Sequence, residues 1–297
     1  MAVKFNVDKC SVMHIGTRNI QYTYKMNGQV LQQVDAQSDL GVVIRKDLKA
    51  SDQCAKAYAK ASRVLGMIGR NIRYKSREVM LRLYKSMVRP HVEYCTVAWS
   101  PHYVKDKQLI EKIQRRFIKM IPGFEDLSYE EGLRILRLNT LEERRNRADL
   151  ILLFKMYKEL SRPPFESLFQ LTNQEKTRGH TLKLTRHCTN RDVRLYFFSE
   201  RVINSWNQLD QSVVDAGCVH GHWTRSNEGF MHSEMTRWTC SRIKNPFGPR
   251  PDQDFLLVRL YQVNYQVNFF DRENKHASTS RPDSISLQTS SSIIRIC

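Results

Sequence analysis

The feature that most constrains the fold is a helical spacing of apolar residues that begins at Ser51 and continues to about Leu160. Apolar side chains that recur every three or four positions line one face of an α-helix and leave the other face for water. The first such stripe consists of Cys54, Ala57, Tyr58, Ala61, Val64, Leu65 and Ile68. The spacing therefore predicts a bundle of amphipathic helices over residues 51–160.

Local signals predict where these helices begin and end. Ser51 is a suitable N-cap, because its hydroxyl can accept a hydrogen bond from the first turn. Pro90 disfavours helical geometry at the residue before it and predicts the end of a second helix. A third helix is expected from about Leu109 to Ile121, before Pro122-Gly123.

Two capping boxes predict further helix starts. In Ser128-x-x-Glu131 and Thr140-x-x-Glu143, the hydroxyl and the carboxylate can each accept a free backbone N–H of the first turn. We expect helices over Tyr129–Leu136 and from Leu141 to about Leu160.

Residues 3–48 have the pattern of short strands. Asn27-Gly28 lies between two apolar-bearing runs and predicts a type I′ hairpin, since both turn positions need a positive φ. Residues 40–44 predict a further buried strand. The expected fold class is α+β, mostly α, with a small antiparallel sheet followed by a basic helical bundle and an irregular C-terminal tail.

The sequence after the bundle changes character twice. Arg162-Pro163-Pro164 ends the helical run, and the apolar spacing from Arg194 to Leu209 predicts one more amphipathic helix. After about Gly217 the pattern is lost, and Lys275 to Ser292 has the Ser/Thr-rich composition of disordered chain. We divide the chain into a sheet-forming part (1–50), a helical bundle (51–160), a C-terminal helical region (161–216) and a divergent, partly disordered tail (217–297).

Positive charge is the strongest indication of function. The chain has 48 Lys and Arg against 30 Asp and Glu, a net charge of +18, and residues 40–160 hold 26 of the former against 14 of the latter. Such a chain is a candidate polyanion binder, because neutralised phosphates release counterions. The candidate contacts from two predicted helices are Lys56, Lys60, Arg63, Lys112, Arg115, Arg116 and Lys119. An ordinary solvated helix face explains any single one of these charges equally well.

Several function classes lack their motifs. The chain has no Gly-x-x-x-x-Gly-Lys-Ser/Thr loop, no Gly-x-Gly-x-x-Gly and no Gly-x-Ser-x-Gly, so ATPase, Rossmann and hydrolase interpretations are unsupported. No apolar run approaches the ~20 residues of a membrane span, and no apolar segment of a secretory signal follows Met1. We expect an intracellular protein, nuclear or cytoplasmic, without a membrane partner.

Metal and thiol chemistry is sparsely represented. The chain has no Asp-Asp pair, and capping explains its adjacent Glu and Asp residues. Cys218-x-His220-x-His222, with His232 and Cys240 downstream, lacks the usual zinc-finger spacing. His187-Cys188 are neighbours in sequence, which rarely gives catalytic geometry. We expect no metal site, no cofactor and reduced cysteines.

Blocks of residues from Phe5 to about Asn207 resemble one known family. They include Phe5 to Gly16, Asp39 to Val42, Tyr84 to Cys95 and Trp99-Ser100-Pro101. The likeness continues through Ile110 to Arg116, Leu141 to Arg145, Thr177 to His180, Phe197 to Val202 and Trp206-Asn207. Together these blocks resemble the C-terminal part of LINE-type, non-LTR retrotransposon reverse transcriptases of the jockey-like group, over about residues 3–216.

The resemblance implies roles for a few residues. The Asn-x-x-Lys block of the family follows the catalytic Asp-Asp strand of the palm, so Lys9 would act near the triphosphate of the incoming nucleotide. Asp39, Leu40, Gly41 and Val42 match the primer-grip region, where a glycine suits a close backbone approach. The helices from Ser51 onward would be the thumb, which grips the backbone of a template–primer duplex.

The resemblance also implies what this chain does not do. The palm strand with its Asp-Asp pair, which binds Mg²⁺ in the complete family enzyme, is expected before residue 1. We therefore expect a truncated remnant of an RNA-directed DNA polymerase that binds RNA or an RNA–DNA duplex through backbone contacts and is inactive alone. The alternative is a domesticated nucleic-acid-binding module, or a protein-interaction helical module, without any enzymatic role.

Overall fold

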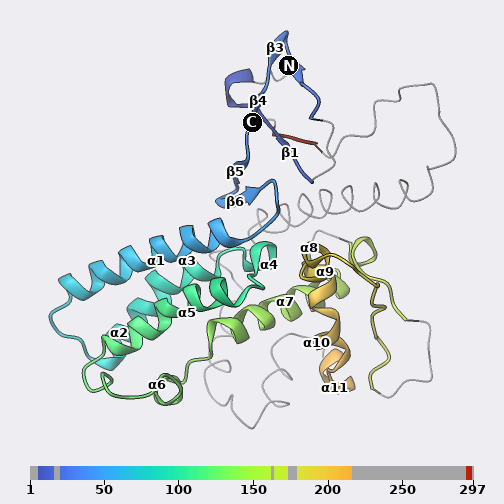
Figure 1. The fold of residues 1–297 in the computed structure, drawn as a ribbon. Coiled ribbons are helices and arrows are strands. Elements are labelled where there is room, and N and C mark those ends of the chain that lie inside the picture. The colour runs from blue at the N-terminus through green and yellow to red at the C-terminus, as the bar shows by residue number, and fades with distance from the viewer. Residues whose placement is uncertain (1–5, 17–20, 162–163, 173–178, 216–291, 296–297) are drawn as a thin grey trace. The chain divides into compact units, whose positions relative to one another are not determined.

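The computed structural model describes residues 6–16, 21–161, 164–172, 179–215 and 292–295. They belong to two compact units (Figure 1), one formed by residues before Ser51 with the C-terminal strand, and the other beginning at Ser51. The fold class is α+β, mostly α, as predicted. No helix among these residues is long and apolar enough to cross a bilayer.

The first unit is built from short strands. Its elements are η1 (Val7–Lys9), β1 (Ser11–His14), β2 (Lys25–Met26), β3 (Gln29–Val30), β4 (Gln32–Gln33), β5 (Ala36–Asp39), β6 (Val42–Arg45) and β7 (Ser292–Arg295). Strand β1 is buried along its whole length and lies between β4 and β7. It pairs antiparallel with β7 but parallel with β4, so the predicted antiparallel pattern does not hold for that one pair. Cys10, Val12 and Leu31 form its small core.

Two hairpins of this unit close through residues with positive φ. Asn27 and Gly28 have φ values of 52° and 83° between β2 and β3, which confirms the type I′ turn. Leu40 and Gly41 have φ values of 46° and 84° between β5 and β6. The prediction of a buried strand over residues 40–44 is therefore wrong at its start, because Leu40 and Gly41 form the turn and the strand begins at Val42. It is also wrong in its burial, since only Val42 of β6 is buried and the rest of the strand is half-buried.

The second unit is helical. Its elements are α1 (Ser51–Asn71), α2 (Arg77–Leu83), the π-helical turn η2 (Tyr84–Val88), α3 (Arg89–Glu93), α4 (Thr96–Trp99), α5 (Val104–Lys119), α6 (Tyr129–Leu136), α7 (Leu141–Tyr157), η3 (Phe165–Ser167), α8 (Asp192–Leu195), α9 (Phe198–Arg201), α10 (Ile203–Asn207) and α11 (Gln211–Val214). Both predicted capping boxes are present, at the starts of α6 and α7.

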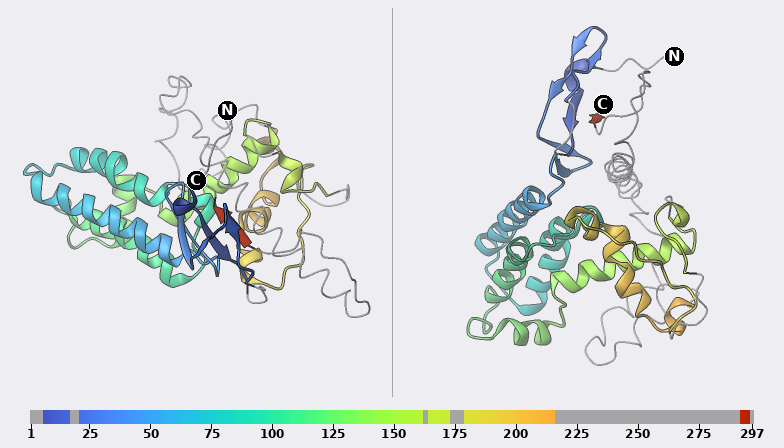
Figure 2. Two further views of the ribbon diagram at one scale, coloured as in Figure 1. Left: turned by 90° about the horizontal axis from the view of Figure 1, so that it is seen from above. Right: turned by 45° about the vertical axis from the view of Figure 1, so that its right-hand side comes forward.

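Helices α1 and α5 form the centre of the bundle and run parallel. Ser51 at the start of α1 donates to Oδ2 of Asp106 in the first turn of α5, at 2.7 Å. Ser62 meets Arg116 further along both helices, and a Cβ on Gly69 would lie 2.8 Å from Cε of Met120 just past the end of α5. Residues later in α1 therefore contact residues later in α5, as in parallel helices. The two helices lie side by side in Figures 1 and 2.

Pro90 does not end the second helix, contrary to the prediction. Helical geometry continues through Arg89, with φ −57° and ψ −39°, into α3, where Pro90 occupies the first turn. The N–H of Arg89 donates to the carbonyl of Tyr84 in a π-type turn. Proline has no backbone N–H, but the first residues of a helix do not need one, because their N–H groups have no intrahelical acceptor. Pro90 in the first turn of α3 is therefore compatible with a continuous helical path.

The single helix predicted from Arg194 to Leu209 is also wrong, because the backbone breaks between α8 and α9. Phe197 is extended, with φ −68° and ψ 153°. The break leaves the carbonyl of Tyr196 to accept from Nη1 of Arg201 at 3.1 Å. The apolar spacing itself was informative, since Phe198, Val202, Ile203 and Trp206 are all buried.

The segment of residues 180–184 is held against α10 by side chains. Trp206 Nε1 donates to the Leu182 carbonyl at 2.8 Å, and Asn207 exchanges two hydrogen bonds with the backbone of Leu184 at 2.9 and 3.0 Å. The buried ring of His180 lies 2.9 Å from the Trp206 carbonyl. His180 and Trp206-Asn207, which are distant in the sequence, thus meet in one structural contact.

Candidate nucleic-acid interface

The three predicted cations of α1 share the face opposite its buried stripe. Lys60 and Arg63 are exposed and Lys56 is partly exposed, whereas Cys54, Ala57, Ala61, Leu65 and Ile68 are buried. At about 100° per residue, positions 56, 60 and 63 fall within about 60° of one another around the helix. The arrangement places three positive charges along one line of the surface.

Charge crowding on this face affects Lys56. Partial burial lowers the pKa of the Lys56 ammonium group, and the nearby charge of Lys60 lowers it further. An anion held between the two ammonium groups would offset this repulsion. Lys56 and Lys60 thus lie close enough on the α1 face for their charges to interact.

The predicted cations of α5 also lie opposite its buried stripe, but most have partners inside the protein. Arg115 lies over the ring of Tyr129, with 4.8 Å from Cζ to the ring centroid. Arg116 Nη1 donates to Ser62 Oγ at 3.0 Å. Lys119 Nζ donates to the carbonyls of Glu125 and Leu127, which closes the loop after α5. These three cations thus stabilise the fold.

Lys112 differs from its neighbours on α5. Its side chain is exposed, and it makes no hydrogen bond or ion pair with any residue in the described part of the chain. Of the four α5 residues that the sequence predicts as phosphate contacts, it is the one whose charge is not used within the bundle.

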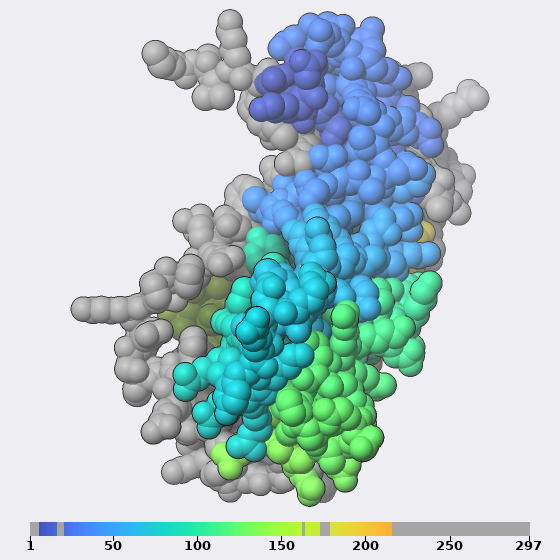
Figure 3. All heavy atoms as spheres, turned by 90° about the vertical axis from the view of Figure 1, so that its left-hand side faces the viewer, coloured from blue at the N-terminus to red at the C-terminus, as the bar shows by residue number. Residues whose placement is uncertain are grey.

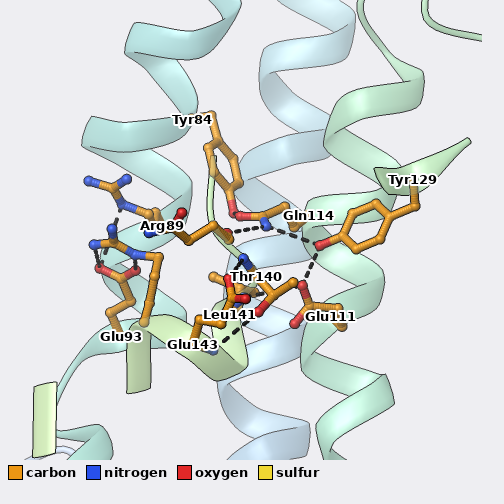
Figure 4. Close-up of polar contacts among 11 residues, drawn as sticks. Tyr84, Arg89, Glu93, Glu111, Gln114, Tyr129, Thr140, Leu141 and Glu143 are labelled. Atoms are coloured by element: carbon orange, nitrogen blue, oxygen red, sulfur yellow. Dashed lines mark hydrogen bonds and ion pairs between the residues drawn. The ribbon is translucent and has the colours of Figure 1, made fainter. Parts of the chain in front are cut away.

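A buried polar network holds α5 in place (Figure 4). Tyr84 donates to Gln114 Oε1 at 2.7 Å, and Gln114 Nε2 donates to the hydroxyl of Tyr129 at 3.0 Å. Tyr129 in turn donates to Glu111 Oε1, which also accepts the N–H of Leu141 at 3.2 Å. The network joins the π-turn to α5, α6 and α7, so the rotation of α5 and the direction of its basic face are fixed.

Burial determines the protonation of this network. Burial raises the pKa of both tyrosines, with a further rise from the charge of Glu93 at Tyr84 and from the hydrogen bond to Glu111 at Tyr129. Both phenols therefore remain donors at neutral pH. Stacking of Tyr84 on Phe117, with ring centroids 4.1 Å apart, packs the same place with apolar surface.

Carboxylates of the helical unit are largely used inside the protein. Glu93 pairs with Arg144 and Arg89, Glu142 with Lys107 at 2.6 Å, and Asp149 with Arg201. Others accept backbone or hydroxyl hydrogen bonds: Asp106, Glu111, Glu125, Glu131 and Glu143. Among the described residues, Lys60 and Lys112 form no such ion pair.

The predicted residues of the first unit lie at two turns. Lys9 is the exposed last residue of η1, whose start is capped by the side chain of Asn6. Asp39 ends β5, Leu40 and Gly41 form the hairpin turn, and Val42 begins β6 with 1% of its surface exposed. The structure thus places Asp39 to Val42 in one hairpin. The positive φ of Gly41 is a sufficient reason for a glycine there.

Sequence reasoning missed one cluster of basic residues. The connection between α1 and α2 carries Arg73, Tyr74 and Lys75, with Arg70 and Arg77 in the adjoining helix ends. Helical periodicity does not single these residues out, because they lie at helix ends and in the connection between them. The signal was nevertheless in the sequence, since no Asp or Glu occurs between Asp52 and Glu78.

Other candidates from the sequence have no supporting geometry. His187 Nδ1 lies 3.3 Å from the buried Glu200 carboxylate, so it faces an acid. The His and Cys residues from 218 to 240 lie outside the described residues. Within the described ranges no three His, Cys, Asp or Glu side chains are grouped to hold a metal ion.

Comparison of the chain with protein-family models, curated proteins and solved structures found no match.

Proposed function

We propose that the helical unit binds the phosphate backbone of RNA or of an RNA–DNA duplex, as the thumb-like part of a non-LTR retrotransposon reverse transcriptase. The observation that carries this proposal is the line of basic residues on the outer face of α1. Lys60 and Arg63 are exposed there beside the partly exposed Lys56, and Lys112 is exposed on α5. An excess of cations on rigid helices suits contact with phosphates.

The spacing on α1 fits a phosphate strand. Lys56 and Arg63 are seven residues apart, which at 1.5 Å per residue is about 10 Å along the helix. One strand of a duplex carries a phosphate about every 3.4 Å along its axis. The three α1 cations therefore span about three phosphates, and such contacts position a duplex without reading its bases.

In this proposal the first unit contributes two further contacts, which rest on the family resemblance. Lys9 would meet the triphosphate of a nucleotide from its exposed turn, and Asp39 to Val42 would meet the primer end from their hairpin. Because the chain has no Asp-Asp pair, we expect no primer extension by this chain alone.

A second candidate function follows from the internal contacts of α5. Arg115, Arg116 and Lys119 serve the fold, so the charge of that helix does not require a polyanion. This favours a nucleic-acid-binding or protein-interaction helical module without an enzymatic role. Charge reversal of Lys112 that weakened a protein complex and left nucleic-acid binding unchanged would support a protein partner.

Fluorescence anisotropy of the full chain on a labelled RNA–DNA primer–template tests the first proposal. We expect binding that weakens steeply as salt rises, and no extension when Mg²⁺ and nucleotides are added. The variant Lys56→Gln/Lys60→Gln should bind more weakly than the matched control Lys155→Gln/Arg186→Gln, which removes two exposed charges elsewhere on the helical unit.

Three results would contradict the proposal. Absence of binding at low salt would remove the nucleic-acid partner, and equal losses in the two double variants would mean that only total charge matters. Primer extension by the purified chain would show that the polymerase carboxylates lie within this sequence.

A further inference from the structure

The connection between α1 and α2 combines one exposed ring with several basic residues. In the sequence Arg70, Arg73, Lys75 and Arg77 flank Tyr74, and no acidic residue lies within this stretch. Tyr74 is 79% exposed, the highest value among the large hydrophobic side chains that the structure describes as exposed. The ring therefore offers an accessible aromatic face beside these cations.

None of these five side chains serves the fold through a polar contact. Among the described residues they form no hydrogen bond, ion pair, ring contact or cation–π contact with one another or with any neighbour. The cations of α5, in contrast, are tied to Tyr129, Ser62 and loop carbonyls. Charge that stabilises nothing internal is available to a ligand.

The connection is short and anchored at both ends. The N–H of Ile72 donates to the Ile68 carbonyl at 3.0 Å and extends α1, and Ser76 caps α2 by accepting the N–H of Val79. Gly69 packs closely on Met120 at the end of α5. Figure 3 views this end of the helical unit, where the cyan surface of the connection stands toward the viewer. The ring is thus presented from a fixed support, which lowers the entropic cost of binding.

We propose that this connection binds single-stranded nucleic acid, with Tyr74 stacked on an unpaired base and the flanking cations on the adjacent phosphates. Stacking on an aromatic ring accepts any base, because every base has a π-face, and cations along a strand supply the rest of the affinity. Insertion into an anionic membrane surface depends on a large apolar face, whereas this connection has one aromatic ring flanked in the sequence by four cations. The inference rests on the proposed nucleic-acid function and adds a single-strand site to it.

Two probes separate stacking from backbone contact: a labelled single-stranded RNA and a blunt duplex of the same length. Tyr74→Ala should weaken binding of the single strand about tenfold, and should leave the blunt duplex within about twofold, since paired bases offer no free face. Tyr74→Phe keeps the ring and should bind as the wild type does. The matched control is Tyr22→Ala, which removes a tyrosine that is 64% exposed in the first unit and should change neither affinity.

The charges give a second readout. Arg73→Gln/Arg77→Gln should reduce the slope of log affinity against log salt on the single strand by about 1.4, at about 0.7 for each lost phosphate contact. The variants at Arg73, Tyr74 and Arg77 should keep the wild-type melting temperature, because these side chains make no polar contact within the described residues.

The outcomes distinguish this inference from the function on which it rests. If the wild type binds both probes and Tyr74→Ala loses nothing on the single strand, the inference fails and the proposed function stands. If the wild type binds neither probe, both fail. Binding to phosphatidylserine vesicles that depends on Tyr74, with unchanged single-strand affinity, would assign the ring to a lipid surface and overturn the inference.

Discussion

Helices α1 and α5 lie side by side with basic faces of similar composition, but they use their charge differently. On α5, Arg115, Arg116 and Lys119 reach a ring, a hydroxyl and two carbonyls of the protein. On α1, Lys60 is exposed with its charge close to that of Lys56. The comparison teaches that net charge in a sequence counts both cations that hold a fold together and cations that face outward. The former should affect stability, and the latter binding.

The largest effect on the unfolding free energy is expected at the ion pair of Arg201 with Asp149. Arg201 makes two hydrogen bonds to the buried Asp149, at 2.8 and 2.9 Å, and a third to the carbonyl of Val97 at 2.8 Å. Asp149→Ala leaves this guanidinium without its counter-charge and should cost about 3–5 kcal/mol of unfolding free energy. Urea denaturation measures the loss. The double variant Asp149→Leu/Arg201→Met should lose less than the single one, and a single-variant loss below about 1 kcal/mol would contradict this account.

A smaller effect is expected at the buried network that orients α5. Tyr84→Phe removes the hydroxyl that donates to Gln114 Oε1 and should cost about 1–3 kcal/mol, because a buried acceptor loses its partner. Tyr74→Phe is the matched control, since the Tyr74 hydroxyl has no partner in the described part of the chain. Thermal unfolding that shifts equally in both variants would show that the network does not matter for stability.

A still smaller effect on stability is expected at Arg116, and it distinguishes the role of charge on α5 from its role on α1. Arg116→Gln loses the hydrogen bond to Ser62 and should reduce the unfolding free energy by about 0.5–1 kcal/mol. Lys60→Gln removes a charge that lies near another lysine and should leave stability unchanged or slightly higher. Chemical denaturation of the two variants compares them, and a larger loss for Lys60→Gln would reverse the assignment of the two faces.

The smallest effect is a pH dependence at the start of α6. Hydrogen bonds from the hydroxyl and the N–H of Ser128 lower the pKa of the Glu131 carboxyl below its ordinary 4.5. A lower pKa in the folded state means that the ionised form stabilises the helix above pH 4.5, and that this stabilisation is lost as the pH falls through the folded-state value. Ser128→Ala should flatten this part of the stability curve. An unchanged slope below pH 4.5, measured by thermal melts, would show that the capping box contributes nothing.

Periodicity and capping signals predicted most of the bundle. The buried stripe of α1, the capping boxes of α6 and α7, and the Asn27-Gly28 turn depend on local preferences that a sequence displays directly. The breaks were missed for tertiary reasons. The helical path continues past Pro90 because a π-type turn precedes it. The backbone of Phe197 is extended where Arg201 donates a hydrogen bond to the Tyr196 carbonyl.

The candidate site was predictable in part. Helical spacing was enough to place Lys56, Lys60 and Arg63 on one face of α1, because position around a helix follows from sequence number alone. It could not show that Arg115, Arg116 and Lys119 have internal partners, since those partners come from other elements of the fold. The cluster of Tyr74 and its flanking cations was missed because its interest depends on the exposure of the ring, which the structure shows and the sequence does not.

The most direct test of the central claim compares the two helices in one binding experiment. Affinity for an RNA–DNA duplex is measured over a range of salt for the wild type, for Lys56→Gln/Lys60→Gln and for Arg115→Gln/Arg116→Gln. We predict that the α1 variant reduces the slope of log affinity against log salt by about 1.8, at about 0.9 for each phosphate contact, and that the α5 variant leaves the slope nearly unchanged. Equal reductions in both variants, or a reduction confined to α5, would contradict the account.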